Sequence, residues 1–117
     1  MLSLKGAATM AHYELTKAAD QDFEHIFDFG INTFGLVQAM DYQQGMKKRF
    51  EELAEQPKLY QAIDHIRTGY RRSVYQSHSI YYKIETNHIL IVRILGQQNP
   101  KTALKNLKIS SLTNQPE

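Results

Sequence analysis

From residue 17 onward, the spacing of the apolar residues changes once along this chain of 117 residues. From residue 17 to residue 56, apolar side chains recur every three or four positions, which is typical of helices that bury one face. From residue 70 to residue 95 they alternate or run together, which is typical of strands. Helices followed by strands, in a chain long enough for one hydrophobic core, predict a single domain of the α+β class.

A glycine divides the helical part into two. Thr16 can cap a first helix, which we expect over residues 17–33, and Gly35 separates it from a second helix. The second helix should end near Gln56, because Pro57 disfavours helical geometry in the residue before it. So short a connection makes the two helices an antiparallel hairpin. We expect the hairpin to contribute an aromatic stripe to the core, formed by Phe23, Phe27, Phe34 and Phe50.

Four segments have the pattern of strands, at residues 11–16, 70–75, 78–85 and 89–95. The last three follow one another through short connections, as in an antiparallel meander. The final segment is apolar on both faces apart from Arg93, which is typical of a central strand covered on both sides. The predicted fold is therefore an N-terminal strand and an antiparallel helical hairpin packed on a three- to four-stranded antiparallel sheet. A groove should remain along the sheet and the edge of the hairpin.

The two ends of the chain differ from this central part. We expect the domain to span residues 10–100. Residues 1–9 lack periodicity, so we interpret them as a leader or a non-native extension without fixed structure. Residues 101–117 are a basic tail, which could form a short helix or become ordered only on a partner.

The formal net charge of +2 combines two halves of opposite sign. Residues 1–64 carry 6 Lys and Arg against 10 Asp and Glu, which gives a net charge of −4. Residues 65–117 carry 8 against 2, which gives +6. A basic surface attracts acidic proteins or phosphate chains, so the second half is expected to meet an acidic partner.

The composition also excludes several classes of protein. The sequence has no cysteine, hence no disulfide and no thiolate chemistry, which suits the cytoplasm. No apolar run approaches the ~20 residues needed to cross a bilayer. No glycine-rich phosphate loop occurs, so we predict neither a cofactor nor a small-molecule substrate. No metal site is predicted either, because the five histidines lack ligand-like spacing: His12, His25, His65, His78 and His88.

Three segments follow one another in the predicted sheet, IRTGYRR at Ile66–Arg72, SHSIYYKI at Ser77–Ile84 and IVRIL at Ile91–Leu95. AADQDF in the first helix and Phe34–Gly35 between the helices precede them. In this order the segments resemble the ParE branch of the ParE/RelE toxin superfamily, over about residues 11–100.

The resemblance implies a toxin of a chromosomal or plasmid type II toxin–antitoxin system, of the kind that serves plasmid stabilisation. Such a toxin inhibits DNA gyrase by binding and is neutralised by a ParD-like antitoxin in a hetero-oligomer. ParD-like antitoxins offer an amphipathic, acidic segment that orders on binding, and the predicted groove should receive it. The residues expected to meet its carboxylates are Arg67, Arg71, Arg72, Lys83 and Arg93. Inhibition by binding requires no catalytic residue.

The same superfamily offers a second function, that of a RelE/YoeB-like ribosome-dependent mRNA endonuclease. An RNA-cleaving site needs a base, an acid and cations near the scissile phosphate. In this chain the candidates are Arg71, His78, Tyr82 and Arg93. The nuclease pattern calls for His or Tyr just past the last strand, where Gly96 stands, and this disfavours the endonuclease. The departure at Gly96 also leaves a third alternative, a binding module that has lost its toxicity.

Three of these candidates have competing structural interpretations. His78 is expected to be a half-buried strand residue with a backbone hydrogen bond. Arg93 needs either an internal carboxylate or carbonyl partner or contact with a binding partner, and the sequence favours neither. Arg71 and Arg72 should point to opposite faces, because side chains alternate along a strand.

Overall fold

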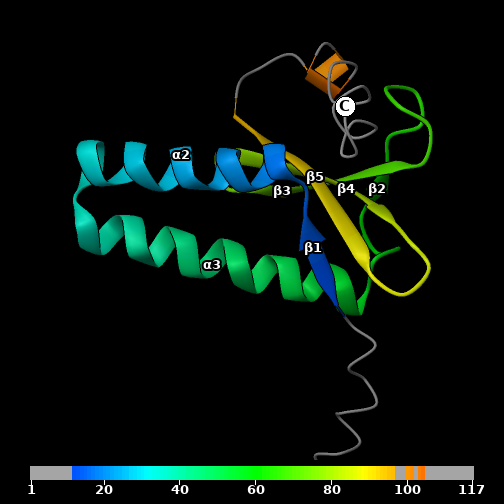
Figure 1. Ribbon diagram of the computed structural model, residues 1–117, viewed down its shortest axis with the longest axis horizontal. Helices are drawn as coiled ribbons and strands as arrows, with labels where there is room; N and C mark the ends of the chain where they lie inside the picture. The colour runs from blue at the N-terminus through cyan, green and yellow to red at the C-terminus, as the bar shows by residue number, and fades with distance from the viewer. Residues whose placement is uncertain (1–11, 97–99, 102, 105–117) are drawn as a thin grey trace, which may run out of the picture.

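In the computed structural model a helical hairpin packs against one face of a five-stranded sheet (Figure 1). Residues 12–96, 100, 101, 103 and 104 are described. The elements are β1 (Tyr13–Leu15), α2 (Lys17–Phe34), α3 (Leu36–Glu55), β2 (Gln61–Ala62), β3 (Tyr70–Tyr75), β4 (His78–Ile84) and β5 (Ile89–Leu95). This confirms the α+β class, the N-terminal strand and the hairpin. The predicted leader and nearly all of the predicted basic tail lie outside the described residues.

The hairpin forms where the capping residues predicted it. The Thr16 hydroxyl accepts a hydrogen bond from the Ala19 amide at 3.0 Å and itself lies 2.9 Å from the Val92 carbonyl, so the cap also ties α2 to β5. Gly35 reverses the chain with φ +96°, a value that favours glycine. Its amide donates to the Ile31 carbonyl at 3.0 Å. No helix in the described part of the chain is long and apolar enough to cross a membrane.

The sheet has the strand order β1-β5-β4-β3-β2. The predicted antiparallel meander β3-β4-β5 is confirmed. Two features differ from the prediction of three to four antiparallel strands. Strand β1 lies beside β5, the last strand of the meander, and runs parallel to it. The short strand β2 pairs with Arg71 and Arg72 of β3, and two residues are too few to show a period in the sequence.

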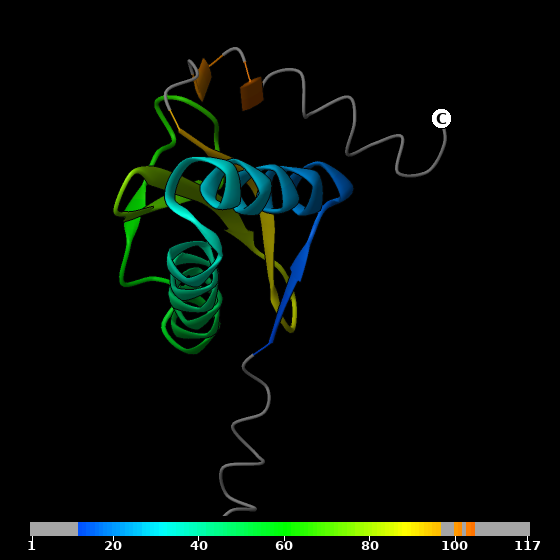
Figure 2. The same cartoon turned by 90° about the vertical axis from the view of Figure 1, so that its left-hand side faces the viewer.

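Hydrophobic side chains cover both faces of the sheet, as the apolar final strand indicated. Under the hairpin, α3 packs on the sheet through a cluster that includes Met46, Phe50, Leu53, Ile80, Tyr82, Ile91 and Ile94. On the opposite face a second cluster contains Ile63, Tyr70, Tyr81, Val92, Leu95 and Leu104. Pro100, Lys101, Ala103 and Leu104 are helical, and Leu104 is buried in this second cluster. The start of the tail therefore covers part of the face that the hairpin leaves free (Figure 2).

Two adjacent tyrosines of β4 enter different clusters because side chains alternate along a strand, and β5 carries a bulge opposite them. Along β4 the pairing steps from Tyr81↔Arg93 to Tyr82↔Ile91, so Val92 is the extra residue on β5. Tyr82 packs under the hairpin and Tyr81 packs on the opposite face, and both are buried.

The predicted aromatic stripe is only partly correct. Phe50 is 1% exposed, and Phe23 packs against the same cluster. Phe34, by contrast, is 57% exposed. The outer turns of α2 and α3 extend beyond the edge of the sheet, so no strand lies beneath Phe34 (Figures 1 and 2). The sequence shows the helical phase of Phe34 but not where the sheet ends.

Candidate functional site

Four of the five predicted cationic residues lie on the sheet face that points away from the hairpin: Arg93, which is bound to Asp22, and three others. Tyr70 and Lys83 are cross-strand partners, and the Lys83 ammonium lies 5.9 Å from the centre of the Tyr70 ring. The Arg67 guanidinium lies 5.4 Å from the same ring. Arg72 pairs with Tyr81 on this face. We call Arg67, Arg72 and Lys83 the basic sheet face.

These three cations are partly exposed, and their internal contacts are weak ones. Two of them lie over an aromatic ring, which holds a cation in place without neutralising it. Lys83 also forms an exposed ion pair with Glu85 at 3.4 Å, the kind of pair that contributes little to stability. The basic sheet face can therefore offer positive charge to another molecule.

Arg71 lies on the other face, which confirms that Arg71 and Arg72 point in opposite directions. It pairs with Tyr82, which packs under the hairpin. Its Nη1 donates to the Tyr60 carbonyl at 2.7 Å. This bond holds the segment before β2 against β3, so Arg71 has a structural role whatever else it contacts.

Arg93 has an internal carboxylate partner, one of the two alternatives that the sequence left open. Its Nε and Nη2 donate to the two oxygens of Asp22 at 2.6 and 2.8 Å. Asp22 also accepts from the Ile94 amide at 2.9 Å. The bond to Asp22 raises the pKa of Arg93, against the opposing effect of burial. This bidentate pair fixes α2 on β5.

His78 is half-buried at the start of β4, as expected, but its partner is a side chain. Its Nδ1 lies 2.8 Å from the hydroxyl of Tyr42 on α3. That hydroxyl also lies 3.2 Å from the Tyr75 carbonyl and accepts from the Ser77 amide at 3.3 Å. Burial lowers the pKa of His78 and raises that of Tyr42. Tyr42 thus connects α3 to the turn between β3 and β4.

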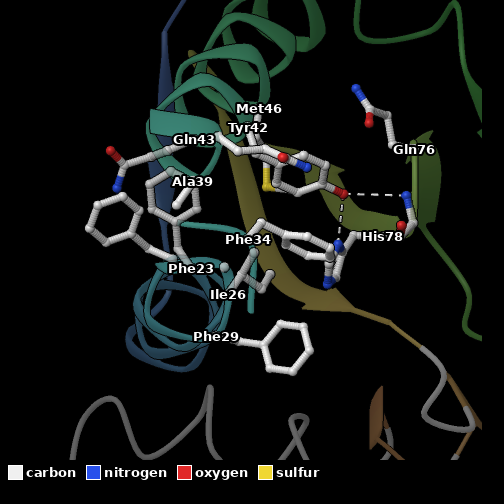
Figure 3. Close-up of a pocket in the computed structure, with 14 residues that line it drawn as sticks. Phe23, Ile26, Phe29, Phe34, Ala39, Tyr42, Gln43, Met46, Gln76 and His78 are labelled. Carbon is white, nitrogen blue, oxygen red and sulfur yellow. Dashed lines mark hydrogen bonds between the residues drawn. The ribbon is translucent and has the colours of Figure 1, made fainter. Parts of the chain in front are cut away.

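A pocket of about 250 Å³ opens beside this Tyr42–His78 pair (Figure 3). It lies between the two helices and the β3–β4 turn, where the sequence predicted a groove along the edge of the hairpin. Its walls are mostly apolar and include Phe23, Ile26, Phe34, Ala39 and Met46. None of the five predicted cationic residues lines it. The apolar and the cationic parts of the predicted antitoxin site are therefore separate surfaces.

The four residues of the endonuclease alternative do not form an open site. Tyr82 is fully buried, its hydroxyl donates to the Pro57 carbonyl at 2.7 Å, and burial raises its pKa to about 12. Arg71 and Arg93 lie on opposite faces of the sheet. A substrate phosphate could not meet both cations together with the tyrosine hydroxyl. Within the described residues there is also no group of three His, Cys, Asp or Glu that could hold a metal ion.

Arg49 was not predicted from the sequence. It binds the part of β3 that lies beyond the two residues paired with β2. Its Nη1 donates to the Ser73 hydroxyl at 2.8 Å and to the Val74 carbonyl at 2.9 Å. Its guanidinium lies 5.7 Å from the ring centre of Tyr60 and 5.4 Å from that of Tyr75. The available signal was helical phase, since Arg49 follows buried Met46 by three positions whereas the neighbouring lysines do not.

Comparisons with known proteins agree with this architecture. Residues 13–100 match the family model for the ParE toxin of the type II toxin–antitoxin system parDE. Toxin ParE1 of Caulobacter vibrioides is 32% identical over 88 residues, which cover 75% of this chain and 91% of that protein. Toxin ParE1 of Mycobacterium tuberculosis is 30% identical over 89 residues, with the same coverage.

A solved structure described as the chromosomal ParDE TA system from P. aeruginosa is similar in fold. Its TM-score is 0.66 at 18% sequence identity, and the match covers 74% of this chain and 96% of that chain. The family model spans the hairpin and the whole sheet, and the two relatives match over 88 and 89 residues. The chain therefore belongs to the ParE toxin family of type II toxin–antitoxin systems.

Proposed function

We propose that this toxin inhibits DNA gyrase by binding to it and is neutralised by a ParD-like antitoxin. Membership of the ParE family is the observation that carries the proposal. The absence of an open proton-transfer site among Arg71, His78, Tyr82 and Arg93 supports binding over RNA cleavage. A bound inhibitor acts by stabilising one state of its target, through a difference in affinity between states.

The basic sheet face is the part of the molecule that suits an acidic antitoxin segment. Arg67, Arg72 and Lys83 are partly exposed and lie on one face. Such a surface would speed association with an acidic segment and would lose affinity as salt rises. Arg71 and Arg93 remain in the proposed contact set, but their bonds to Tyr60 and Asp22 reduce what they can offer. We expect the first three residues to contribute most.

Two assays on the purified protein test the choice of target. In a DNA supercoiling assay, the protein should inhibit gyrase at amounts comparable to the enzyme. In a translation extract, ribosome-bound mRNA should remain intact. Specific cuts at ribosome-bound codons, with gyrase unaffected, would favour the endonuclease instead. If neither activity is seen and cells that express the soluble protein without antitoxin grow normally, the chain is a binding module that has lost its toxicity.

The antitoxin contact is tested separately by charge reversal. Arg72→Glu and Lys83→Glu should each weaken binding of the ParD-like protein by about tenfold, with a reduced salt dependence. Lys47→Glu is the matched control, because Lys47 is an exposed cation on α3 and lies outside this face. Equal losses for Lys47→Glu and Arg72→Glu would show that only the net charge matters and would overturn the proposed contact.

A further inference from the structure

The end of the hairpin exposes an apolar patch. Five large apolar side chains within residues 29–40 are each at least 45% exposed, and we call them the apolar tip: Phe29, Phe34, Leu36, Val37 and Met40. No charged residue occurs between residues 29 and 40. Exposed apolar patches of this kind usually mark binding surfaces for other proteins.

The apolar tip continues into the pocket described above. Phe29 and Phe34 belong to both, and their ring centres lie 6.5 Å apart in a T-shaped arrangement. The polar residues that line the pocket are glutamines, Ser77 and the Tyr42–His78 pair, and none of them is an acid, a lysine or an arginine (Figure 3). A partner could therefore place an apolar side chain in the pocket while it covers the tip.

The charges around the tip are of one sign. Residues 18–46 contain five carboxylates and no lysine or arginine. One of the five, Asp22, is paired with Arg93. Asp28 and Asp41 stand at the two ends of the uncharged stretch, and both are exposed. The hairpin end is thus apolar with an acidic border, the reverse of the basic sheet face.

This charge pattern discriminates among possible occupants. An acidic antitoxin segment would meet Asp28 and Asp41 with charge of the same sign, and so would the tip of a second copy of the chain. A surface that has an apolar centre and a border of lysine or arginine would be complementary in both respects.

We propose that the apolar tip is the surface that binds the target enzyme, at an apolar site on that enzyme bordered by basic side chains. This inference rests on the proposed function, since it assigns the contact surface for gyrase. The antitoxin and the target then use different faces of the toxin. Neutralisation must arise because the bound antitoxin obstructs the approach of the enzyme and not because it fills the pocket.

The test compares two variants in the gyrase supercoiling assay, Val37→Glu and Leu59→Glu. Val37 is 75% exposed at the tip and Leu59 is 67% exposed away from it, so both changes replace an exposed aliphatic side chain by a carboxylate. Val37→Glu should raise the half-inhibitory concentration by about tenfold or more, a typical loss for a central interface residue. Leu59→Glu should leave inhibition unchanged. Circular dichroism and thermal unfolding confirm that both variants fold.

A second pair tests the acidic border. Asp28→Lys combined with Asp41→Lys should raise the half-inhibitory concentration, whereas Glu55→Lys, at the far end of α3, should not. Binding of the ParD-like antitoxin should be the same for all these variants.

Each of the remaining outcomes contradicts the inference, and each leads to a different conclusion about the tip or the toxin. Equal inhibition by the wild-type chain and Val37→Glu would overturn the inference and leave the proposed function standing. Absence of inhibition by the wild-type chain would overturn the proposed function, and this inference with it. If Val37→Glu keeps inhibition but loses antitoxin binding, the tip is an antitoxin site. If it keeps inhibition but converts a dimer to a monomer in sedimentation, the tip is an interface between two copies.

Discussion

The two ends of the helical hairpin differ in what covers them. At the base, Met46, Phe50 and Leu53 are buried against the sheet, and Arg93 binds Asp22. At the tip, Phe34 and Val37 face solvent beside an open pocket. The same helices therefore stabilise the fold at one end and expose an apolar surface at the other. Stability and binding should consequently respond to different substitutions.

The largest expected contrast is between Phe50 and Phe34. Phe50→Ala should lower the free energy of unfolding by about 3–5 kcal/mol, because it leaves a cavity beside the rings of Tyr13 and Phe23. Phe34→Ala should lower it by less than about 1 kcal/mol, because the side chain is already exposed. Urea unfolding measures both. Equal losses would show that the tip belongs to the core and would remove the distinction between the two ends.

The ion pair at the base gives the next contrast. Asp22→Asn should cost about 2 kcal/mol, because it leaves the half-buried Arg93 guanidinium without its carboxylate. Asp28→Asn, six residues further along α2, changes an exposed carboxylate and should cost less than about 0.5 kcal/mol. Guanidinium chloride is a salt and would screen the attraction between Asp22 and Arg93, so urea is the appropriate denaturant. A similar small effect for both would mean that the pair is not formed in solution.

The boundary between base and tip is marked by Gly45. A Cβ at this position would collide with the hydroxyl of Tyr75 and lie 2.9 Å from its Cζ, and the Tyr75 ring is held beside Tyr42 and Arg49. Gly45→Ala should therefore destabilise the protein by about 1 kcal/mol, although alanine is the better helix former. In a Tyr75→Leu background the same change should be less harmful or even stabilising. Thermal unfolding of the four proteins tests this, and an unchanged cost in both backgrounds would contradict the proposed contact.

The smallest effect concerns His78, at the mouth of the pocket. Burial lowers its pKa below the ordinary value of 6.5, so the unfolded chain takes up a proton at this residue more readily than the folded one. The contribution of neutral His78 to stability is therefore complete above pH 6.5 and declines as the pH falls below it. His78→Gln should flatten the pH dependence of unfolding in this window. His65→Gln, at an exposed histidine, is the matched control, and an identical change in both variants would rule out His78 as the source.

Much of the fold could be predicted because its signals are local. Thr16 and Gly35 set the hairpin to within one residue of the observed ends, alternation located β4, and the apolar run at residues 89–95 located β5. The parallel pairing of β1, the two-residue strand β2 and the exposure of Phe34 depend on how distant segments meet. The residues that neighbour these positions in the sequence do not indicate which distant segments they will contact.

The candidate site was likewise predictable from the sequence only in part. The basic half of the chain and the opposite directions of Arg71 and Arg72 follow from composition and alternation. The sequence could not show that Arg93 would find Asp22, 71 residues earlier, nor that Tyr42 would reach His78. It also gave no sign that the cations would lie on one surface and the apolar pocket on another, because that separation arises only when the hairpin extends past the sheet.

We propose that the target and the antitoxin bind to different faces of this toxin. The most direct test measures gyrase inhibition and antitoxin affinity side by side for Val37→Glu and Arg72→Glu. We predict that Val37→Glu loses inhibition but binds the antitoxin normally, and that Arg72→Glu does the opposite. If either variant weakens both activities by similar factors while remaining folded, the two partners share one surface and the account is wrong.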